Sequence, residues 1–374
     1  MQNPVTGLAL GGIGGFNTHD AGVLKALYDS AIVPDIITCT SGAIFWTHEF
    51  LVRPEQIREE VERQVESVEG ANALAVAFLG DPGIFAPAYR QYWTRWLTPW
   101  KTLSWKELFD RILPAQIYEP KRKPQDYAAM ADVFNHSTVP IVFNAFAISR
   151  GRELLFCNPA AFDFLGVTAG SRSARRLEDE ITTEYRPIDA GAVEAALWLV
   201  LYGLEHRYEG EIVVDGAYHR QLIISELSMC DVIYAVKPQS DAWHGAPPSN
   251  YFEVQNFNTE MWFNSSFAAE VASLRRTGRP DARIERITMD RPLGFFNFFV
   301  EKLENYTDGY EKAQKIFERD RDTMHPLIYP LYRETVPEPP GSNREAVNGA
   351  GSTDDVTGTR TSTRRGRATK PRPD

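Results

Sequence analysis

Cysteine is scarce, and the few cysteines present form no recognisable ligand or disulfide pattern. The 374 residues contain three of them at widely separated positions, Cys39, Cys157 and Cys230. An odd set without a CxxC pair or a His/Cys ligand spacing favours neither a disulfide framework nor a zinc site. We therefore expect no bound metal ion and a reducing, cytoplasmic environment.

Long apolar runs are also missing. No stretch approaches the roughly 20 residues that a membrane-spanning helix needs. The opening residues, MQNPVTGLALGG, lack the basic region and the apolar core of a secretion signal. These absences predict a protein that is neither secreted nor integral to a membrane.

Positive charge is in deficit over most of the chain. The formal net charge is −10, and residues 360–374 carry six basic residues against one acidic residue, which leaves −15 on the residues before them. Because an acidic body repels phosphodiester backbones, we expect no specific nucleic-acid partner. The basic end could contact phosphate or an anionic lipid surface. A solvated, disordered tail is nevertheless the favoured interpretation of residues 337–374, where apolar residues almost vanish.

The rest of the composition is that of a globular protein. Apolar residues make up 43% of the chain and aromatic residues 12%, which is enough for a sizeable core. The sequence contains no internal repeat and no second independent core. It therefore predicts one domain over residues 1–336.

Two strand-turn-helix units open this domain. The apolar run 6–10 stops at the glycine cluster GGIGG (11–15), and residues 19–32 then repeat apolar side chains at helical spacing. A second run, 36–38, leads through a turn at Ser41 into GAIFWTHEFLV. Two such units in succession predict parallel strands joined by right-handed crossovers, and hence an α/β fold. Further strands are predicted at 139–149, 153–158, 211–218 and 230–238, and helices at 190–206, 259–276 and 296–318.

Residues of about 54–130 form a helical, aromatic-rich insertion in this pattern. Residues 54–67 predict a charged amphipathic helix, and residues 81–105 concentrate the aromatic side chains. Tyr89, Trp93, Trp96 and Trp100 share one helical face. Such a stripe more often packs in a core than binds a ligand, but near an active site it could shelter an acyl chain.

Ser41 has two interpretations. It can be a nucleophile presented on a sharp turn between a strand and a helix, or a hydroxyl that caps the helix N-terminus. Its flanks, Cys39 and Ala43, are small where the usual G-x-S-x-G elbow has glycine, so a tight turn is sterically allowed. In an alternative register Thr40 would be the nucleophile, which places a β-branched residue at the turn.

Two further features could complete a catalytic site. The GGIGG loop offers unobstructed backbone N–H groups before a helix, which suit a phosphate or an oxyanion. It lacks the lysine of a P-loop and the spacing of a dinucleotide fingerprint. Asp215 ends a strand in VVDGAY, where it is either a turn former or a base. Since no histidine occupies an obvious motif, a Ser-Asp dyad is easier to defend than a triad.

In their order and separation these motifs resemble the patatin-like lipid acyl hydrolases. The matching stretches are LALGGIGGFNTHDAGVLKAL, PDIITCTSGAI, FNAFAISRGRELLF and VVDGAY, over roughly residues 5 to 330. The resemblance implies a three-layer α/β/α fold with a mainly parallel central sheet. It also implies hydrolysis of lipid or phospholipid esters through an acyl-enzyme, without a cofactor. Ser41 would be the nucleophile and Asp215 its base, with an oxyanion loop formed by Gly12, Ile13, Gly14 and Gly15.

The glycine loop departs from the family pattern. Ile13 stands at the family's middle glycine, Phe16 at its cation and Asn17 at its final glycine. Losing one oxyanion donor typically costs about 2.7–4 kcal/mol of transition-state stabilisation. An alternative is therefore a catalytically impaired relative that binds a lipid or a protein partner, and acyl transfer to an alcohol or thiol is a third option.

A phospholipid substrate would also imply peripheral contact with a membrane. FFNFF (295–299) is one candidate for that contact, although a buried helix is favoured there.

Overall fold

The computed structural model describes residues 4–67, 84–99, 104–112, 114–173, 182–277, 279–291, 300–328 and 330–332. Met1–Glu334 forms one compact unit. The predicted tail, residues 337–374, lies outside the described residues, as does the segment 295–299.

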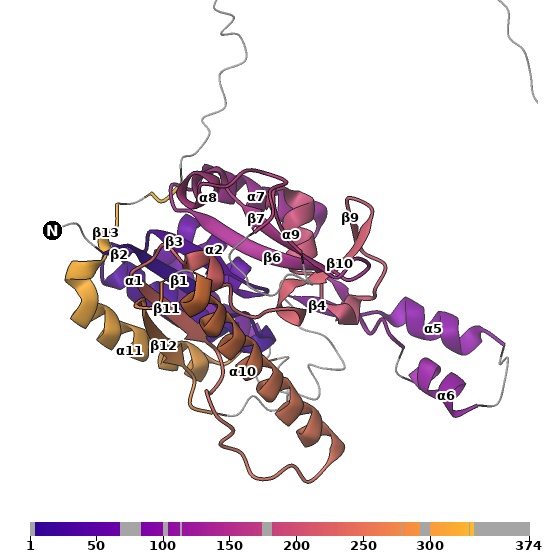
Figure 1. Ribbon diagram of the computed structural model, residues 1–374. Helices are drawn as coiled ribbons and strands as arrows, with labels where there is room; N and C mark the ends of the chain where they lie inside the picture. Colours follow the sequence, from indigo (N-terminus) through magenta and orange to yellow (C-terminus); the bar gives the residue numbers. More distant parts are fainter. Residues whose placement is uncertain are drawn as a thin grey trace, which may run out of the picture. The chain divides into compact units, whose positions relative to one another are not determined.

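A nine-stranded sheet forms the centre of the described chain (Figure 1). Its order is β12-β11-β1-β3-β6-β10-β9, and β7 and β8 continue from β6. The strands are β1 (Thr6–Leu10), β3 (Ile36–Cys39), β6 (Ile141–Ala147), β7 (Arg152–Cys157), β8 (Thr183–Pro187), β9 (Arg207–Tyr208), β10 (Glu211–Asp215), β11 (Val232–Lys237) and β12 (Arg283–Thr288). Strands β12, β11, β1, β3 and β6 run parallel to one another, which confirms the predicted α/β class and mainly parallel sheet.

Helices cover both faces of this sheet. On one face the largest hydrophobic cluster packs residues from helices α1 (Thr18–Asp29), α2 (Ala43–Val52), α3 (Ile57–Ser67), α7 (Pro124–His136), α9 (Ala190–Ala196) and α11 (Leu303–Asp320). On the other face a second cluster packs residues from α8 (Pro159–Leu165) and α10 (Tyr251–Thr277). The two clusters on opposite faces confirm the three-layer α/β/α arrangement.

Short elements connect these layers. The small sheets pair β2 (Ile32–Val33) with β13 (His325–Pro326) and β4 (Phe85–Pro87) with β5 (Tyr118–Pro120). The 3-10 helices are η1 (Gly14–Asn17), η2 (Pro54–Gln56), η3 (Val200–Tyr202), η4 (Gly216–Tyr218), η5 (Ser225–Leu227) and η7 (Arg321–Thr323).

The aromatic stripe of the insertion does not join the core. Helices α5 (Tyr89–Leu97) and α6 (Trp105–Ile112) lie side by side, away from the central sheet (Figure 1). Tyr89, Trp93 and Trp96 are 55%, 66% and 47% exposed, so the favoured prediction of core packing is wrong for them, and Trp100 lies outside the described residues. By contrast, α3 and α7, at the two ends of the insertion, pack into the main core.

Three predicted helices have different ends in the structure. The helix predicted at 296–318 begins at Leu303 and ends at Asp320. The helix predicted at 190–206 stops at Ala196, and the carbonyl of Trp198 then accepts the backbone N–H of Asp215 at 2.9 Å. The helix predicted at 259–276 begins earlier, at Tyr251, because the side-chain oxygen of Asn250 accepts the N–H of Glu253 at 3.1 Å. Local caps and long-range contacts, rather than apolar spacing, set these ends.

Candidate active site

The strand register brings the ends of β3 and β10 together along one edge of β6. β7 pairs with the other edge of β6, so β3 and β10 share the remaining edge. Cys39, the last residue of β3, lies opposite Phe143, and Asp215, the last residue of β10, lies opposite Ala145. Because β10 runs antiparallel to β6 and β3 runs parallel to it, the two strands meet end to end. The residues that follow β3 therefore meet Asp215.

Ser41 lies on a strained turn between β3 and α2. Its φ is +55°, a left-handed conformation that costs roughly 1–2 kcal/mol for a residue other than glycine. The turn is closed by the N–H of Ile44, which donates to the carbonyl of Ser41 at 2.9 Å. The small flanks Cys39 and Ala43 do not need positive φ, because the strain falls on Ser41 itself. This is the local geometry of a nucleophile elbow.

Gly12 of the glycine loop contacts this turn directly. Leu10 of β1 pairs with Cys39 of β3, so that Gly12 and Ser41 each lie two residues beyond the paired ends. A Cβ added to Gly12 would lie 2.0 Å from the carbonyl oxygen of Thr40 and 2.5 Å from the Cβ of Ser41. Only glycine allows the loop and the turn to approach this closely.

Asp215 is a buried carboxyl with an unusual pKa. Its side chain is 1% exposed, and Oδ1 accepts the N–H of Ala217 at 2.8 Å. Burial raises the pKa of Asp215 to about 7, although the Ser41 hydroxyl and the Ala217 N–H both act to lower it. Among the described residues Oδ2 has no hydrogen bond of full geometry, so the contact with Ser41 is loose. Such contacts often tighten only when substrate binds.

Thr40, the nucleophile of the alternative register, lies in a different environment. Its side chain is fully buried, and its hydroxyl has no hydrogen-bond partner within the described part of the chain. The carbonyl of Thr40 accepts the N–H of Ala43 at 3.2 Å. The Ser41 hydroxyl, by contrast, interacts with the Asp215 carboxyl and acts to lower its pKa. The geometry thus favours Ser41 over Thr40.

The four residues of the predicted oxyanion loop are not equivalent. The N–H of Ile13 donates to the side-chain oxygen of Asn17 at 2.6 Å, so it is unavailable to an oxyanion. Gly14 has a φ of +45° and begins the short 3-10 helix η1. Across the described ranges, the N–H groups of Gly12, Gly14 and Gly15 have no acceptor. Three backbone donors of the loop therefore remain without an acceptor among the described residues, and Gly12, which carries one of them, packs directly against Ser41.

Asn17 connects the glycine loop to the start of α2. A Cβ added to Gly42 would lie 1.7 Å from the amide nitrogen of Asn17. The Asn17 side chain therefore lies between the Ile13 amide and the start of α2. It holds the loop against the helix.

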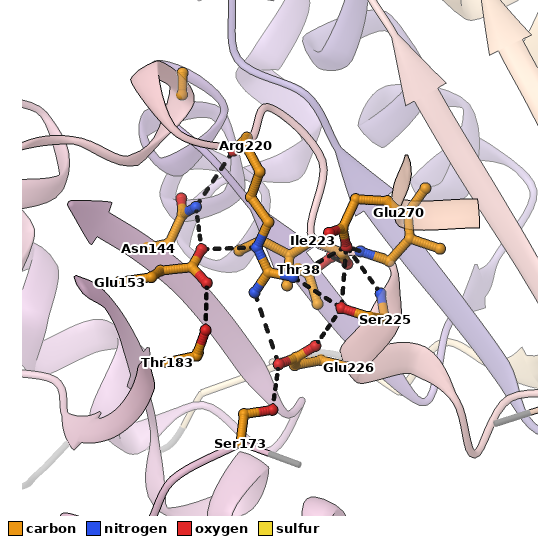
Figure 2. A network of polar contacts seen from close by, with 12 residues as sticks. Thr38, Asn144, Glu153, Ser173, Thr183, Arg220, Ile223, Ser225, Glu226 and Glu270 are labelled. Carbon is orange, nitrogen blue, oxygen red and sulfur yellow. Dashed lines mark hydrogen bonds and ion pairs between the residues drawn. The ribbon is translucent and has the colours of Figure 1, made fainter. Parts of the chain in front are cut away.

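A buried ion network, which the sequence motifs did not predict, supports the segment after Asp215. Figure 2 shows Arg220 surrounded by Glu153, Glu226 and Glu270, with the Arg220 guanidinium 2.7 Å, 3.6 Å and 3.0 Å from their carboxylates. All four side chains are at most 1% exposed. Although burial acts to lower the pKa of Arg220, the three carboxylates raise it well above its usual value.

The network reaches Gly216, the residue after Asp215, through Asn144 of β6. The Asn144 amide donates to Glu153 at 2.9 Å and to the carbonyl of Arg220 at 3.3 Å (Figure 2). A Cβ added to Gly216 would lie 2.1 Å from the Asn144 side-chain oxygen, so Asn144 packs against the residue after Asp215. The polar Asn144 inside the otherwise apolar run IVFNAFA is the one sequence signal that could have pointed to this support.

The described residues contain neither a metal centre nor a membrane-spanning helix. Over these ranges, no cluster of three or more His, Cys, Asp or Glu side chains is arranged to hold a metal ion. None of the described helices is both long enough and apolar enough to cross a bilayer.

Neither a protein-family model nor a curated protein matches this chain.

Proposed function

We propose that the protein is a serine hydrolase of lipid carboxylic esters, with a Ser-Asp dyad. Asp215 would accept the proton of Ser41 while Oγ attacks the acyl carbonyl carbon. The N–H groups of Gly12, Gly14 and Gly15 would stabilise the oxyanion. Asp215 would then return the proton to the departing alcohol as the ester C–O bond breaks, and water activated by Asp215 would hydrolyse the acyl-enzyme.

The observation that carries this proposal is the pairing of a strained serine with a buried carboxyl. Ser41 has a φ of +55° and packs directly against Gly12 of the glycine loop. Asp215 interacts with its hydroxyl and has a pKa raised by burial to about 7. A base whose pKa lies near the working pH is the efficient choice for general catalysis. Backbone strain of this kind also concentrates at active sites.

The exposed aromatic side chains of α5 and α6 support a lipid substrate. Trp93 is 66% exposed and Trp105 is 77% exposed. Tryptophan prefers the boundary between water and hydrocarbon, since its ring is apolar and its N–H is polar. These two helices would therefore contact a membrane surface peripherally, from the cytoplasmic side that the scarce cysteines suggest.

A second candidate is a catalytically impaired protein that binds a lipid or a protein partner. It is favoured by the hydrogen bond from the Ile13 N–H to Asn17 at 2.6 Å, which removes one potential oxyanion donor. It is also favoured by the loose contact between Ser41 and Asp215. Such a protein would keep the fold and the exposed aromatic surface and lose turnover.

Pre-steady-state release of p-nitrophenol from a medium-chain ester separates the two candidates. The hydrolase should give a burst followed by steady turnover, which Ser41→Ala abolishes and Thr40→Val leaves nearly unchanged. Equal release from the wild type and Ser41→Ala would exclude Ser41 as the nucleophile. A burst lost in Thr40→Val and kept in Ser41→Ala would assign the alternative register.

A further inference from the structure

A cationic cavity lies on the α10 face of the sheet and is not part of the candidate active site. Its volume is about 720 Å³, and its walls come from α10, from the end of β11 and from β12. Lys237, the last residue of β11, lines the cavity. The carbonyl of the residue before it, Val236, accepts the N–H of Gly11 at 3.1 Å. The cavity therefore begins at the sheet edge that also carries the glycine loop.

The charge in this cavity is unbalanced. Four cationic side chains line it, Lys237, Arg275, Arg276 and Arg286, against the single carboxylate of Asp241. That carboxylate already pairs with Lys237 at 2.5 Å and with Arg286 at 2.7 Å. Within the described chain Arg275 and Arg276 have no ion-pair partner, and both are exposed. The excess of positive charge contrasts with the formal net charge of −10 on the whole chain.

A residue that lines this cavity, Asn264, also carries a buried hydrogen-bond donor that has no acceptor among the described residues. The Asn264 side-chain oxygen accepts from Nζ of Lys237 at 2.9 Å. Because a lysine ammonium can only donate, this contact fixes the orientation of the Asn264 amide. Its Nδ2 is consequently a donor, and it is buried with no partner among the described residues. An acceptor bound in the cavity would satisfy it.

We propose that this cavity binds the phosphate group of a phosphorylated organic molecule. A phosphate offers several acceptor oxygens and up to two negative charges, which match two unpaired guanidinium groups and one free amide donor. The cavity is larger than an inorganic phosphate, and the apolar side chains Phe267, Ala268 and Val271 line the rest of it. They would pack against the organic part of the ligand. This assignment does not depend on hydrolysis at Ser41.

Calorimetric titration of the full chain with inorganic phosphate and with glycerol 3-phosphate tests the assignment. Arg275→Gln/Arg276→Gln should weaken binding by at least about tenfold, since it removes two charge-assisted contacts. The control, Arg150→Gln/Arg321→Gln, changes the charge equally at exposed sites outside the cavity and should bind like the wild type. Both pairs are exposed, so each variant should keep the wild-type melting temperature.

Co-sedimentation with vesicles then distinguishes the source of the phosphate. Vesicles are compared with and without phosphatidic acid, because α5 and α6 would contact either kind. Stronger binding to the vesicles with phosphatidic acid by the wild type and the control, but not by the cavity variant, would assign a lipid head group. If the wild type binds inorganic phosphate or glycerol 3-phosphate, and phosphatidic acid does not strengthen its binding to vesicles, the ligand is a soluble phosphorylated metabolite. No binding of any phosphate by the wild type, or equal binding by all three proteins, would overturn the proposal.

Discussion

Replacing the buried carboxyl of Asp215 by an amide should stabilise the protein while removing its activity. In the wild type, burial raises the pKa of Asp215 from 3.8 to about 7. The folded state thus binds the proton more tightly than the unfolded chain. The stability that the neutral carboxyl provides is fully present below about pH 4 and is lost as the pH rises through about 7. The Asp215→Asn variant would have no such loss, because an amide does not ionise.

The size of this effect follows from the change in pKa. A rise from 3.8 to about 7, at roughly 1.4 kcal/mol for each pKa unit, corresponds to about 4 kcal/mol. No discount for solvent is needed because the side chain is 1% exposed. The linkage relation gives Asp215→Asn an advantage of roughly 2 kcal/mol at about pH 5 and about 4 kcal/mol at about pH 8. The amide keeps an oxygen for the N–H of Ala217, so the turn after β10 should persist.

Urea unfolding of the wild type and Asp215→Asn at about pH 5 and about pH 8 measures this difference. Ester hydrolysis by Asp215→Asn should fall by about 10²–10⁴-fold, the usual contribution of a general base. A stability difference that does not change with pH would refute the argument, because it would mean that the carboxyl is not held neutral by burial. An unaltered rate would show that Asp215 is not the base.

Further variants test the packing around the site, the buried ion network and the membrane contact. Gly12→Ala should destabilise the protein by about 1–3 kcal/mol or more in chemical unfolding and suppress ester hydrolysis, because its Cβ would overlap the Ser41 turn. Gly11→Ala, whose Cβ would meet its nearest atom at 3.1 Å, should have the smaller effect, and the reverse order would contradict the packing. Arg220→Met should cost about 3–5 kcal/mol in urea unfolding, since it leaves buried carboxylates without their cation; a loss under about 1 kcal/mol would be inconsistent with this network. Trp93→Ser/Trp96→Ser should weaken co-sedimentation with phospholipid vesicles about tenfold at unchanged melting temperature, and undiminished binding would exclude α5 from the membrane contact.

The elements nearest the N-terminus were predictable because local patterns determine them. The apolar run 6–10, the glycine cluster and the helical spacing after it correspond to β1, η1 and α1. The order of small residues around Ser41 predicted the turn, at which the structure has a φ of +55°. The position of Asp215 at a strand end was also predictable, since an Asp-Gly pair follows a β-branched run.

The parts that were not predictable depend on contacts between distant residues. No local pattern indicates that β10 meets β3 end to end along β6, and this register brings Asp215 to Ser41. The hydrogen bond from Ile13 to Asn17 likewise requires the folded loop. The exposure of α5 could not be derived from spacing, because an aromatic stripe predicts a buried face whatever lies opposite it.

The most direct test of the central claim is labelling with a fluorophosphonate probe, followed by mass spectrometry of the modified peptide. We expect a single adduct on Ser41, with a labelling rate that rises with pH through about 7 as Asp215 loses its proton, and no adduct in Ser41→Ala. An unlabelled wild-type protein, or an adduct on any other residue, would contradict it.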